Sequence, residues 1–481
     1  MAAEDDNGRE GVTAFVPDLL YAGGRFRRGL ALVCGPGGDV LAVGRAEESG
    51  GRVVRLPGRA LLPGMVNAHS HAFQRVIRGR TEFRSAGGGR DSFWTWREAM
   101  YAAASALSPE DLYDASRMAF TEMALSGITA VGEFHYLHRT PEGEEYADPN
   151  LLAREVVRAA RDVGIRVALL RVAYARAGFR RPPDERQSRF IEPDPARFII
   201  NTEALLKDFG DEVENPRAWA GVAPHSVRAV PLEYLKEVCA FAESRRLPVH
   251  MHVSEQPAEV SACLEETGRT PARLLADEGL LGPRFTAVHA VHVTPEEVRA
   301  LAATRSTVCA CPTTERNLGD GVVPADQMLA AGVSVALGTD SHTQIDLLED
   351  ARELEYHLRL TRLERNVLAP AADEDEGARV SALAARLFEC ATRSGARSIG
   401  SRGGELEPGR PADFFTVDLN DPSVAGADGE DLLPAIVFSL SRAAVREVAV
   451  GGRLVVEDGR HAAQDETVAR FKALRGKLRG A

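Results

Sequence analysis

Eight short apolar segments, separated by stretches of helical periodicity, most constrain how this chain of 481 residues can fold. Each is rich in β-branched residues and has the length of a strand that is buried on both faces. They span residues 65–69, 129–134, 166–172, 218–223, 248–253, 285–290, 306–311 and 333–337. Eight strands alternating with helices favour an α/β fold of the (β/α)₈ barrel type, although the same periodicity also fits an open doubly wound sheet.

The helices between these segments have clear N-terminal sequence signals, whereas the two ends of the chain have the pattern of short strands. Ser108 and Thr294 each precede a proline and an acidic residue two positions further on, which is typical of a helix N-terminus. Short strands and glycine turns recur before residue 62 and again near the C-terminus. We therefore predict a barrel over residues 63–404 and a small β-sandwich built from residues 1–62 and 405–481.

Charge and composition exclude several classes of function. The net charge of −12 provides no basic surface for nucleic acid or anionic membranes, so a small-molecule substrate is expected. No apolar run approaches the roughly 20 residues of a membrane span, and the acidic start MAAEDDNGRE does not match a secretory signal, which predicts a cytoplasmic protein. The six cysteines make no disulfide framework and are expected to be reduced and buried.

Histidines collect where the predicted strands end, which is where a barrel of this type places its active site. Nine of the 12 histidines follow six of the strands: His69, His71, His135, His225, His250, His252, His289, His292 and His342. Two residues at i and i+2 of a strand face the same side, so His69 and His71 can reach one metal ion. With His252 and Asp340 they would complete a site for one zinc ion.

Other residues at the same strand ends suggest catalytic roles. Asp340 could accept a proton from a zinc-activated water, Glu255 could carry it to a leaving nitrogen, and His289 could polarise the tetrahedral intermediate. Two alternatives stay open at this point. Glu255 could instead cap a helix beginning near Gln256, and His250 or His292 could be the true ligand.

The motifs PGMVNAHSH, HMHVSEQ, AVHAVH and LGTDSH, in this order, resemble the metal-dependent deaminase branch of the amidohydrolase superfamily. Within that branch, HSHAFQR, DSFWTWREAMY and GEFHYLHR are similar to the formimidoylglutamate deiminases. The resemblance implies zinc-dependent hydrolysis of N-formimino-L-glutamate to N-formyl-L-glutamate and ammonia, in histidine degradation. It implies a homodimer, ligation by the four residues named above, and catalytic roles for Glu255, His289 and Asp340.

The resemblance also implies a substrate-contacting set, whose members are Gln74, Arg97, Tyr136, His225 and Arg228. The substrate has two carboxylates and an amidine, and arginine binds carboxylates through two parallel hydrogen bonds. Trp94 and Trp96 are expected to pack rather than contact the substrate. The Arg- and Pro-rich loop at 175–195 fits either a lid over the pocket or a surface excursion.

Two other functions compete with this hypothesis. A deaminase or hydrolase of the same superfamily could act on a purine, pyrimidine or triazine, but its pocket would present apolar and stacking groups where this chain has arginines. A scaffold protein could keep the barrel and lose the metal, but the predicted ligand set is complete.

Overall fold

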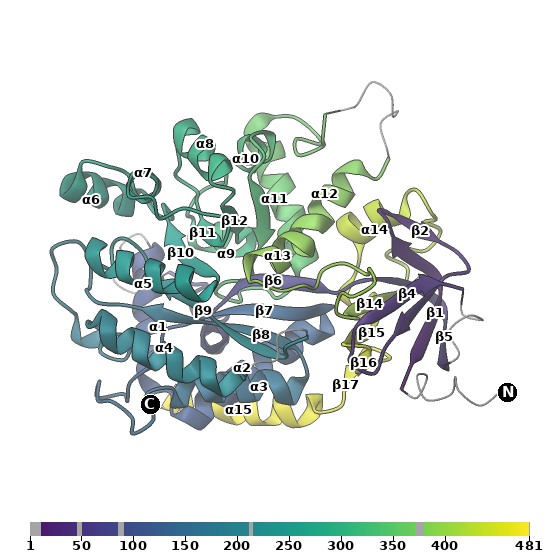
Figure 1. Ribbon diagram of the computed structural model, residues 1–481, viewed down its shortest axis with the longest axis horizontal. Helices are drawn as coiled ribbons and strands as arrows, with labels where there is room; N and C mark the ends of the chain where they lie inside the picture. The colour runs from purple at the N-terminus through teal and green to yellow at the C-terminus, as the bar shows by residue number, and fades with distance from the viewer. Residues whose placement is uncertain (1–10, 46–50, 85–90, 211–214, 372–379, 481) are drawn as a thin grey trace.

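Eight parallel strands form a nearly closed barrel in the computed structural model, which describes residues 11–45, 51–84, 91–210, 215–371 and 380–480 (Figure 1). Neighbouring strands pair in sequence order from β6 to β13. Their bounds are β6 (Met65–Ser70), β7 (Ile128–His135), β8 (Arg166–Ala173), β9 (Ala218–Pro224), β10 (Val249–Val253), β11 (Phe285–His289), β12 (Thr307–Ala310) and β13 (Ser334–Leu337). The predicted (β/α)₈ barrel is confirmed, because a doubly wound sheet would reverse its strand order.

The first and last strands meet through a short seam rather than a full ladder. An isolated parallel bridge joins Ser70 to Asp340. The Asp340 amide donates to the His69 carbonyl at 3.0 Å, and the His71 amide donates to the Asp340 carbonyl at 3.1 Å. Three predicted metal ligands therefore also close the barrel.

Helices cover the outside of the barrel and extend around its mouth (Figure 1). The α-helices are α1 (Phe93–Ala106), α2 (Pro109–Leu125), α3 (Leu151–Val163), α4 (Pro195–Phe209), α5 (Leu232–Arg245), α6 (Pro257–Thr267), α7 (Pro271–Asp277), α8 (Pro295–Ala303), α9 (Pro312–Leu318), α10 (Ala325–Ala330), α11 (Leu347–Arg362), α12 (Ala382–Ala391), α13 (Arg393–Ser398), α14 (Leu432–Ser439) and α15 (Gln464–Gly480). Three short 3₁₀ helices are η2 (Ala72–Ile77), η3 (Glu185–Gln187) and η4 (Arg442–Ala444). The predicted helix starts are confirmed, since Ser108 and Thr294 both form capping boxes.

The N- and C-terminal segments pair with each other in a second sheet, as predicted, and this sheet is a single mixed one. Its strands are β1 (Thr13–Ala22), β2 (Arg25–Arg27), β3 (Ala31–Cys34), β4 (Val40–Gly44), β5 (Arg52–Pro63), β14 (Phe414–Asp418), β15 (Val445–Val450), β16 (Arg453–Glu457) and β17 (Arg460–His461). The two ends of the chain join where β5 runs antiparallel to β14. The exact domain division at residues 62 and 404 stays a prediction.

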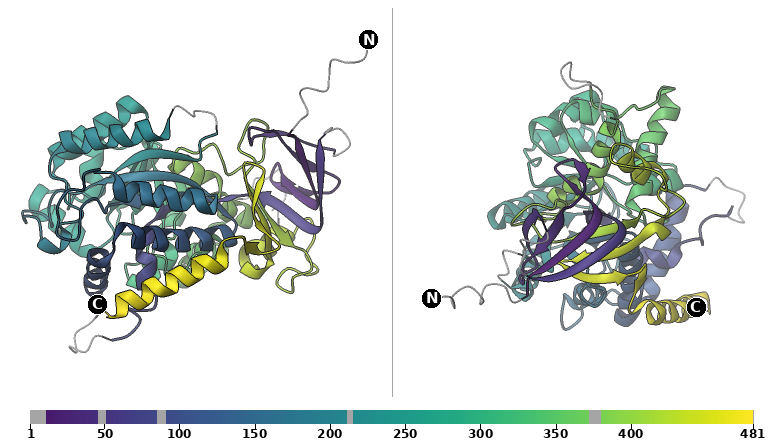
Figure 2. Two further views of the ribbon diagram at one scale, coloured as in Figure 1. Left: turned by 90° about the horizontal axis from the view of Figure 1, so that it is seen from below. Right: turned by 90° about the vertical axis from the view of Figure 1, so that its right-hand side faces the viewer.

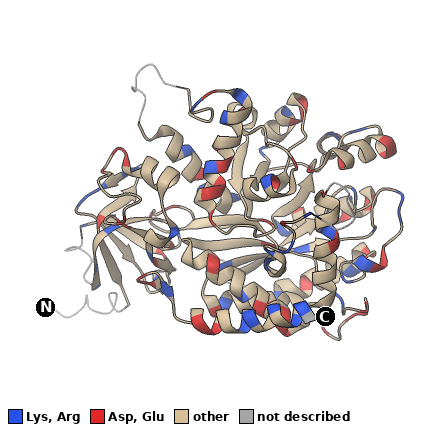
Figure 3. Ribbon diagram, turned by 180° about the vertical axis from the view of Figure 1, so that it is seen from behind, with Lys and Arg blue, Asp and Glu red and all other residues tan. Residues whose placement is uncertain are grey.

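The C-terminal helix α15 leaves this sheet and runs along α2 on the outside of the barrel (Figure 2). Arg117 of α2 pairs with Glu466 of α15 at 2.9 Å, and Arg470 of α15 pairs with Asp114 at 2.6 Å. Acidic and basic side chains are interspersed over the outer helices (Figure 3). No helix in the described part of the chain is both long and apolar enough to cross a membrane.

The cysteines follow the sequence prediction with one exception. All six are free thiols, and five of them are buried, whereas Cys239 on α5 is half-buried. None of them belongs to the group of His69, His71, His252 and Asp340, but Cys311 lies close to His289 and Asp340.

Candidate active site

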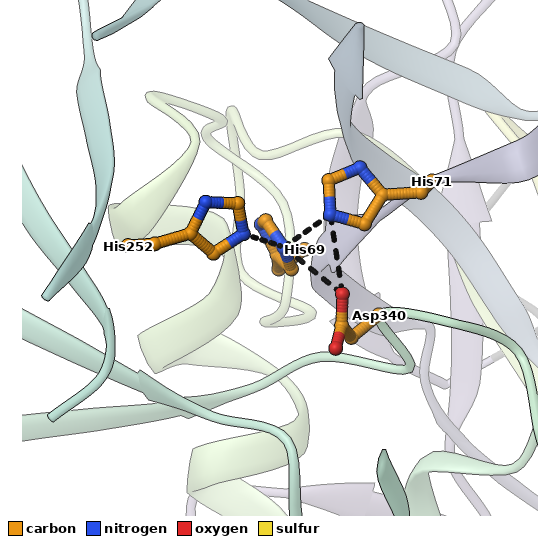
Figure 4. Close-up of side chains that lie close together, drawn as sticks. All are labelled: His69, His71, His252 and Asp340. Atoms are coloured by element: carbon orange, nitrogen blue, oxygen red, sulfur yellow. Dashed lines mark hydrogen bonds and ion pairs between the residues drawn. The ribbon is translucent and has the colours of Figure 1, made fainter. Parts of the chain in front are cut away.

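Four side chains meet at the C-terminal mouth of the barrel and point toward one centre (Figure 4). They come from the end of β6 (His69 and His71), from β10 (His252) and from the loop after β13 (Asp340). The Nε2 atom of His69 lies 3.1 Å from Nε2 of His71 and 3.2 Å from Nε2 of His252. Oδ1 of Asp340 lies 3.3 Å from His69 Nε2 and 3.2 Å from His71 Nε2, and all four residues are buried.

These spacings fit donors that share one metal ion. Ligands about 2.0–2.1 Å from a tetrahedral zinc ion lie roughly 3.3–3.4 Å from one another. Nδ1 of His71 donates to the Phe134 carbonyl at 3.0 Å, and Nδ1 of His252 donates to the His225 carbonyl at 3.1 Å. Because carbonyls accept only, these bonds place the lone pairs of both Nε2 atoms toward the shared centre.

The charge states of the cluster also suit a cation. Burial lowers the pKa of His69 to about 3 and lowers the pKa of His252 well below its usual value. Burial alone would raise the pKa of Asp340, but the neighbouring His69 and His71 outweigh it and hold this pKa well below its usual range. The group therefore offers neutral imidazoles at His69 and His252 and a carboxylate at Asp340, and with His71 these can bind a divalent metal.

A second cluster of ionisable groups adjoins the first at the ends of β11 and β10. Nδ1 of His289 donates to Oε1 of Glu315 on α9 at 3.1 Å, and its Nε2 lies 3.7 Å from Oε1 of Glu255. Burial alone would lower the pKa of His289, but both carboxylates outweigh it and hold this pKa well above its usual value. Burial raises the pKa of Glu255, and the nearby His289 partly offsets this rise. His289 is thus held as a cation that faces the cavity.

The five predicted substrate contacts line one buried cavity beside the metal-binding group. Its lining includes Gln74, Arg97, Tyr136, His225 and Arg228, together with His71, His252, Glu255, His289 and Asp340. Nε2 of Gln74 donates to the Tyr136 hydroxyl at 2.7 Å, which fixes both polar groups at the wall.

The two arginines of this cavity stand out because they lack acidic partners. Nε of Arg97 and Nε of Arg228 are buried without a hydrogen-bond partner, and neither guanidinium has an ion pair within the described residues. Both contact the ring of Trp94, with guanidinium carbons at 4.5 Å for Arg97 and 5.9 Å for Arg228 from its centroid. Burial alone would lower the pKa of Arg228, but Tyr174 and Glu259 outweigh it and keep the guanidinium charged. A buried cation without a carboxylate is costly, so this arrangement favours an anionic ligand.

The sequence pattern described as the amidohydrolase family matches residues 60–455. This chain belongs to the amidohydrolase family. It is 40% identical over 440 residues to the formimidoylglutamate deiminase of Pseudomonas aeruginosa, an alignment that covers 91% of this chain and 94% of that protein. It is 28% identical over 451 residues to a 5-methylthioadenosine/S-adenosylhomocysteine deaminase of Halobacterium salinarum, with 92% of both chains covered.

Solved structures agree with this assignment. A crystal structure of an amidohydrolase from Brucella melitensis superposes with a TM-score of 0.85 at 34% identity, covering 97% of this chain and 99% of that one. The atrazine chlorohydrolase TrzN from Arthrobacter aurescens, whose structure is a complex with zinc, shares the fold with a TM-score of 0.80 at 22% identity, covering 96% and 99% of the two chains. The chain is thus an amidohydrolase enzyme and a homologue of formimidoylglutamate deiminase.

Behind the metal-binding group of this amidohydrolase, a buried hydrogen-bond network links its ligand segments. Ser70 donates to Oε2 of Glu133 at 2.5 Å, and Nε2 of His342 donates to Ser70 Oγ at 3.0 Å. Oε1 of Glu133 accepts from the Ala72 amide at 2.7 Å. Asp340 itself adopts a left-handed φ of 43°, a strained conformation that the surrounding bonds hold in place.

The alternative ligands of the amidohydrolase barrel lie elsewhere. Nε2 of His250 donates to the Ser398 carbonyl at 2.9 Å, and Nε2 of His292 donates to the Asp320 carbonyl at 2.9 Å. Neither belongs to the metal-binding group found among the described residues. The alternative role for Glu255 is not seen either, because Gln256 is the N-cap of α6 and the Glu255 amide donates to Glu259 at 3.0 Å.

Part of the loop at 175–195 forms the wall of the cavity, and so does one of the two tryptophans. Gln187 donates to the hydroxyls of Tyr101 and Tyr174 at 2.7 and 2.8 Å, and Phe190 lines the cavity. Trp96 also lines the cavity, although it was expected only to pack. Sequence reasoning missed Glu133 and Glu315, whose only signals are an acid inside an apolar strand and an acid in the first turn after β12.

Proposed function

We propose that this protein hydrolyses N-formimino-L-glutamate to N-formyl-L-glutamate and ammonia, with one Zn²⁺ per chain held by His69, His71, His252 and Asp340. One observation carries the proposal: three of the four residues of the metal-binding group line the same cavity as two arginines that have no ion pair within the described residues. The substrate has a complementary layout, with an amidine on the α-nitrogen, one carboxylate on the adjacent α-carbon and a second carboxylate at the end of the side chain. The 40% identity to a formimidoylglutamate deiminase supports the same activity.

The cavity wall supplies the groups that would orient such a substrate. Arg97 and Arg228 would each receive a carboxylate through parallel hydrogen bonds. Tyr136, His225 and Gln74 would add hydrogen bonds of fixed direction between the arginines and the metal-binding group. The amidine carbon would then face Asp340 and Glu255 on the opposite wall.

The residues around the metal-binding group can carry the protons of the reaction. Zinc bound there would lower the pKa of a water molecule from 15.7 to about 7. Asp340 would accept the proton that this water loses as its oxygen adds to the amidine carbon. Glu255 would pass that proton, and then the second proton of the former water, to the terminal nitrogen, so that the carbon–nitrogen bond breaks, the new oxygen becomes the formyl carbonyl and ammonia leaves. His289, held as a cation by Glu255 and Glu315, would donate a hydrogen bond to the oxygen on the tetrahedral carbon.

Ammonia release from N-formimino-L-glutamate, with and without a chelator, tests this function. We expect chelator-sensitive release with this substrate and far slower release with N-formimino-L-aspartate, 5-methylthioadenosine, S-adenosylhomocysteine, adenosine, guanine or cytosine. Faster turnover of a ring substrate would support the rival deaminase instead. Elemental analysis of gently purified protein checks for one zinc per chain, and protein without metal that zinc cannot activate would support the scaffold hypothesis.

The expected homodimer and cytoplasmic location accompany this proposal as predictions. Sedimentation analysis at several concentrations measures the oligomeric state, and a monomer throughout would contradict the homodimer. Cell fractionation measures the location.

A further inference from the structure

A second chamber lies on the outer side of the two active-site arginines. It measures about 430 Å³, whereas the inner cavity measures about 50 Å³, and Arg97 and Arg228 line both. The outer walls come from α1 (Trp94), from the loop after β8 (Phe179 and Arg181) and from α6 (Ala262). The larger free space therefore lies outside the arginines, and the arginines form the boundary between the two spaces.

The boundary is positively charged and loosely held. Arg228 is 9% exposed, and its Nε has no hydrogen-bond partner. Arg97 is half-buried and rests on the rings of Trp94 and Tyr101, with its guanidinium carbon 4.5 and 5.3 Å from their centroids. Ring contacts of this kind are weaker than a buried ion pair, so they are easier to break. A carboxylate arriving from outside can therefore draw Arg97 from its ring contacts.

A third arginine of the outer chamber is also free to bind an anion. Arg181 is exposed, and within the described residues it forms no ion pair. Its neighbours Arg176 and Arg180 differ, because both face Glu266, at 3.1 and 3.8 Å. Glu266 is thus paired, Glu259 and Glu265 also line the chamber, and Arg181, Arg97 and Arg228 form no ion pair within the described residues.

We propose that the outer chamber is an encounter site, where a dicarboxylate substrate binds before it passes into the inner cavity. Arg181 receives one carboxylate of the incoming substrate, and Arg97 and Arg228 take over its carboxylates at the boundary. Trp94 positions both boundary arginines through its ring. This inference rests on the proposed function, because it assumes that the substrate is a small dicarboxylate.

Filling the chamber tests the route. Ala262 on α6 lines the outer chamber and not the inner cavity, so Ala262→Trp would block the space without touching the metal-binding group. We expect kcat/KM for N-formimino-L-glutamate to fall at least tenfold, with kcat and metal content nearly unchanged. Ser261→Trp is the matched control, because this neighbouring residue lines neither space, and it should behave as the unmodified protein. Equal kcat/KM for both variants would overturn the proposal.

Charge at the mouth provides a second, independent test. We expect Arg181→Glu to lower kcat/KM about tenfold at an ionic strength of about 0.01 M, where the Debye length is about 30 Å, and much less at about 1 M, where it is about 3 Å. Arg299→Glu, an exposed arginine on α8, is the control and should change little. No difference between the two variants at low salt would contradict the encounter site. If the unmodified protein released no ammonia from this substrate, the proposed function would fail instead.

Discussion

Arg228 is the residue at which the burial of a charge is most evident. It is almost fully buried and stays charged, and within the described residues it forms no ion pair, although Glu259 lies near enough to raise its pKa. Folding must therefore remove a guanidinium from water without the usual compensation. Such a residue is expected where a ligand, and not the protein, supplies the opposite charge.

Replacing this residue separates the two effects. Arg228→Met keeps the length and apolar stem of the side chain, so we expect the thermal midpoint of the ligand-free protein to rise. We expect KM to rise by about 10- to 100-fold, since a hydrogen bond to a charged group contributes about 1.5–3 kcal/mol. Calorimetry and steady-state kinetics measure both, with exposed Arg299→Met as the control. A lower midpoint with unchanged KM would mean that Arg228 is structural.

Glu255 allows a similar separation of chemistry from metal binding. It lies beside His289 and does not belong to the metal-binding group. Glu255→Gln removes the proton carrier and keeps the shape, so ammonia release should fall by about 10²- to 10⁴-fold while the metal content stays the same. Glu243→Gln, on the exposed face of α5, serves as the control. A fully active Glu255→Gln variant would exclude the residue from the mechanism.

Single residues differed in how well the sequence predicted them. His69, His71, His252 and Asp340 could be predicted because each follows a recognisable strand, and barrel topology brings strand ends together. Glu315 could not, because an acid in the first turn of a helix is normally read as favourable to the helix dipole. Its contact with His289 depends on the relative placement of β11 and α9, which local pattern does not encode.

At the scale of elements, the start of α6 holds the backbone of Glu255 and also makes the free energy of unfolding depend on pH. Glu259 in its first turn accepts the Glu255 amide, and burial raises the pKa of Glu259 to about 7. The folded protein therefore binds a proton that the unfolded chain has already lost between roughly pH 4.5 and 7. Stability contributed by this group is present at low pH and is lost as the pH rises through that window.

This pH dependence can be measured by comparing the unfolding free energies of the original protein and a Glu259→Gln variant. The unfolding free energy of the original protein should fall relative to that of Glu259→Gln as the pH rises from 5 to 8, by on the order of 3 kcal/mol. The glutamine can still accept the Glu255 amide. Urea unfolding at several pH values measures the difference, and parallel pH profiles for the two proteins would refute the buried titration.

The seam between β6 and β13 is the second element with a specific consequence. Glu133 on β7 holds both Ser70 and the Ala72 amide, on either side of His71. Gly338 precedes Asp340, and a Cβ at this glycine would lie 2.8 Å from Cβ of His69, so the close approach of the two strands requires glycine. The ligands are therefore aligned by groups that never touch the metal.

Two substitutions test this alignment. Glu133→Ala should weaken metal affinity by about 10- to 100-fold, as loss of an outer partner of a metal site typically does. Glu133→Gln can still accept from Ala72 and hydrogen-bond Ser70, so it should keep most of the affinity. Competition with a chromophoric chelator measures both variants. Equal metal affinity in the two variants would show that Glu133 does not align the metal-binding residues.

Which strands pair with which was predictable strand by strand only where the pairing follows chain order. The eight barrel strands pair consecutively, so periodicity and topology rules were sufficient. The single mixed sheet was predicted only as a small sandwich, because the register of β5 against β14 depends on packing between segments far apart in sequence. The path of α15 along α2 likewise rests on long-range packing, since Phe471 and Leu474 of α15 are buried in the main hydrophobic core.

At the scale of the whole molecule, the metal should contribute to the stability of the fold. Its ligands come from β6, β10 and the loop after β13, so one ion would tie the first strand of the barrel to the last. At a free metal concentration 1,000 times its Kd, binding stabilises the folded state by about 4.1 kcal/mol. Treatment with a chelator should lower the thermal midpoint, and added zinc should restore it. An unchanged midpoint on complete metal removal would show that the barrel closes without the ion.

The sequence separation across the seam between β6 and β13 also determines when the metal-binding residues become available during synthesis. Ser70 and its partner His342 are 272 residues apart in sequence, and Asp340 lies beside that partner. When the ribosome has made the first two histidines, the remaining donors of the site do not yet exist. The chain must therefore finish most of its synthesis before all four residues of the metal-binding group can bind one ion.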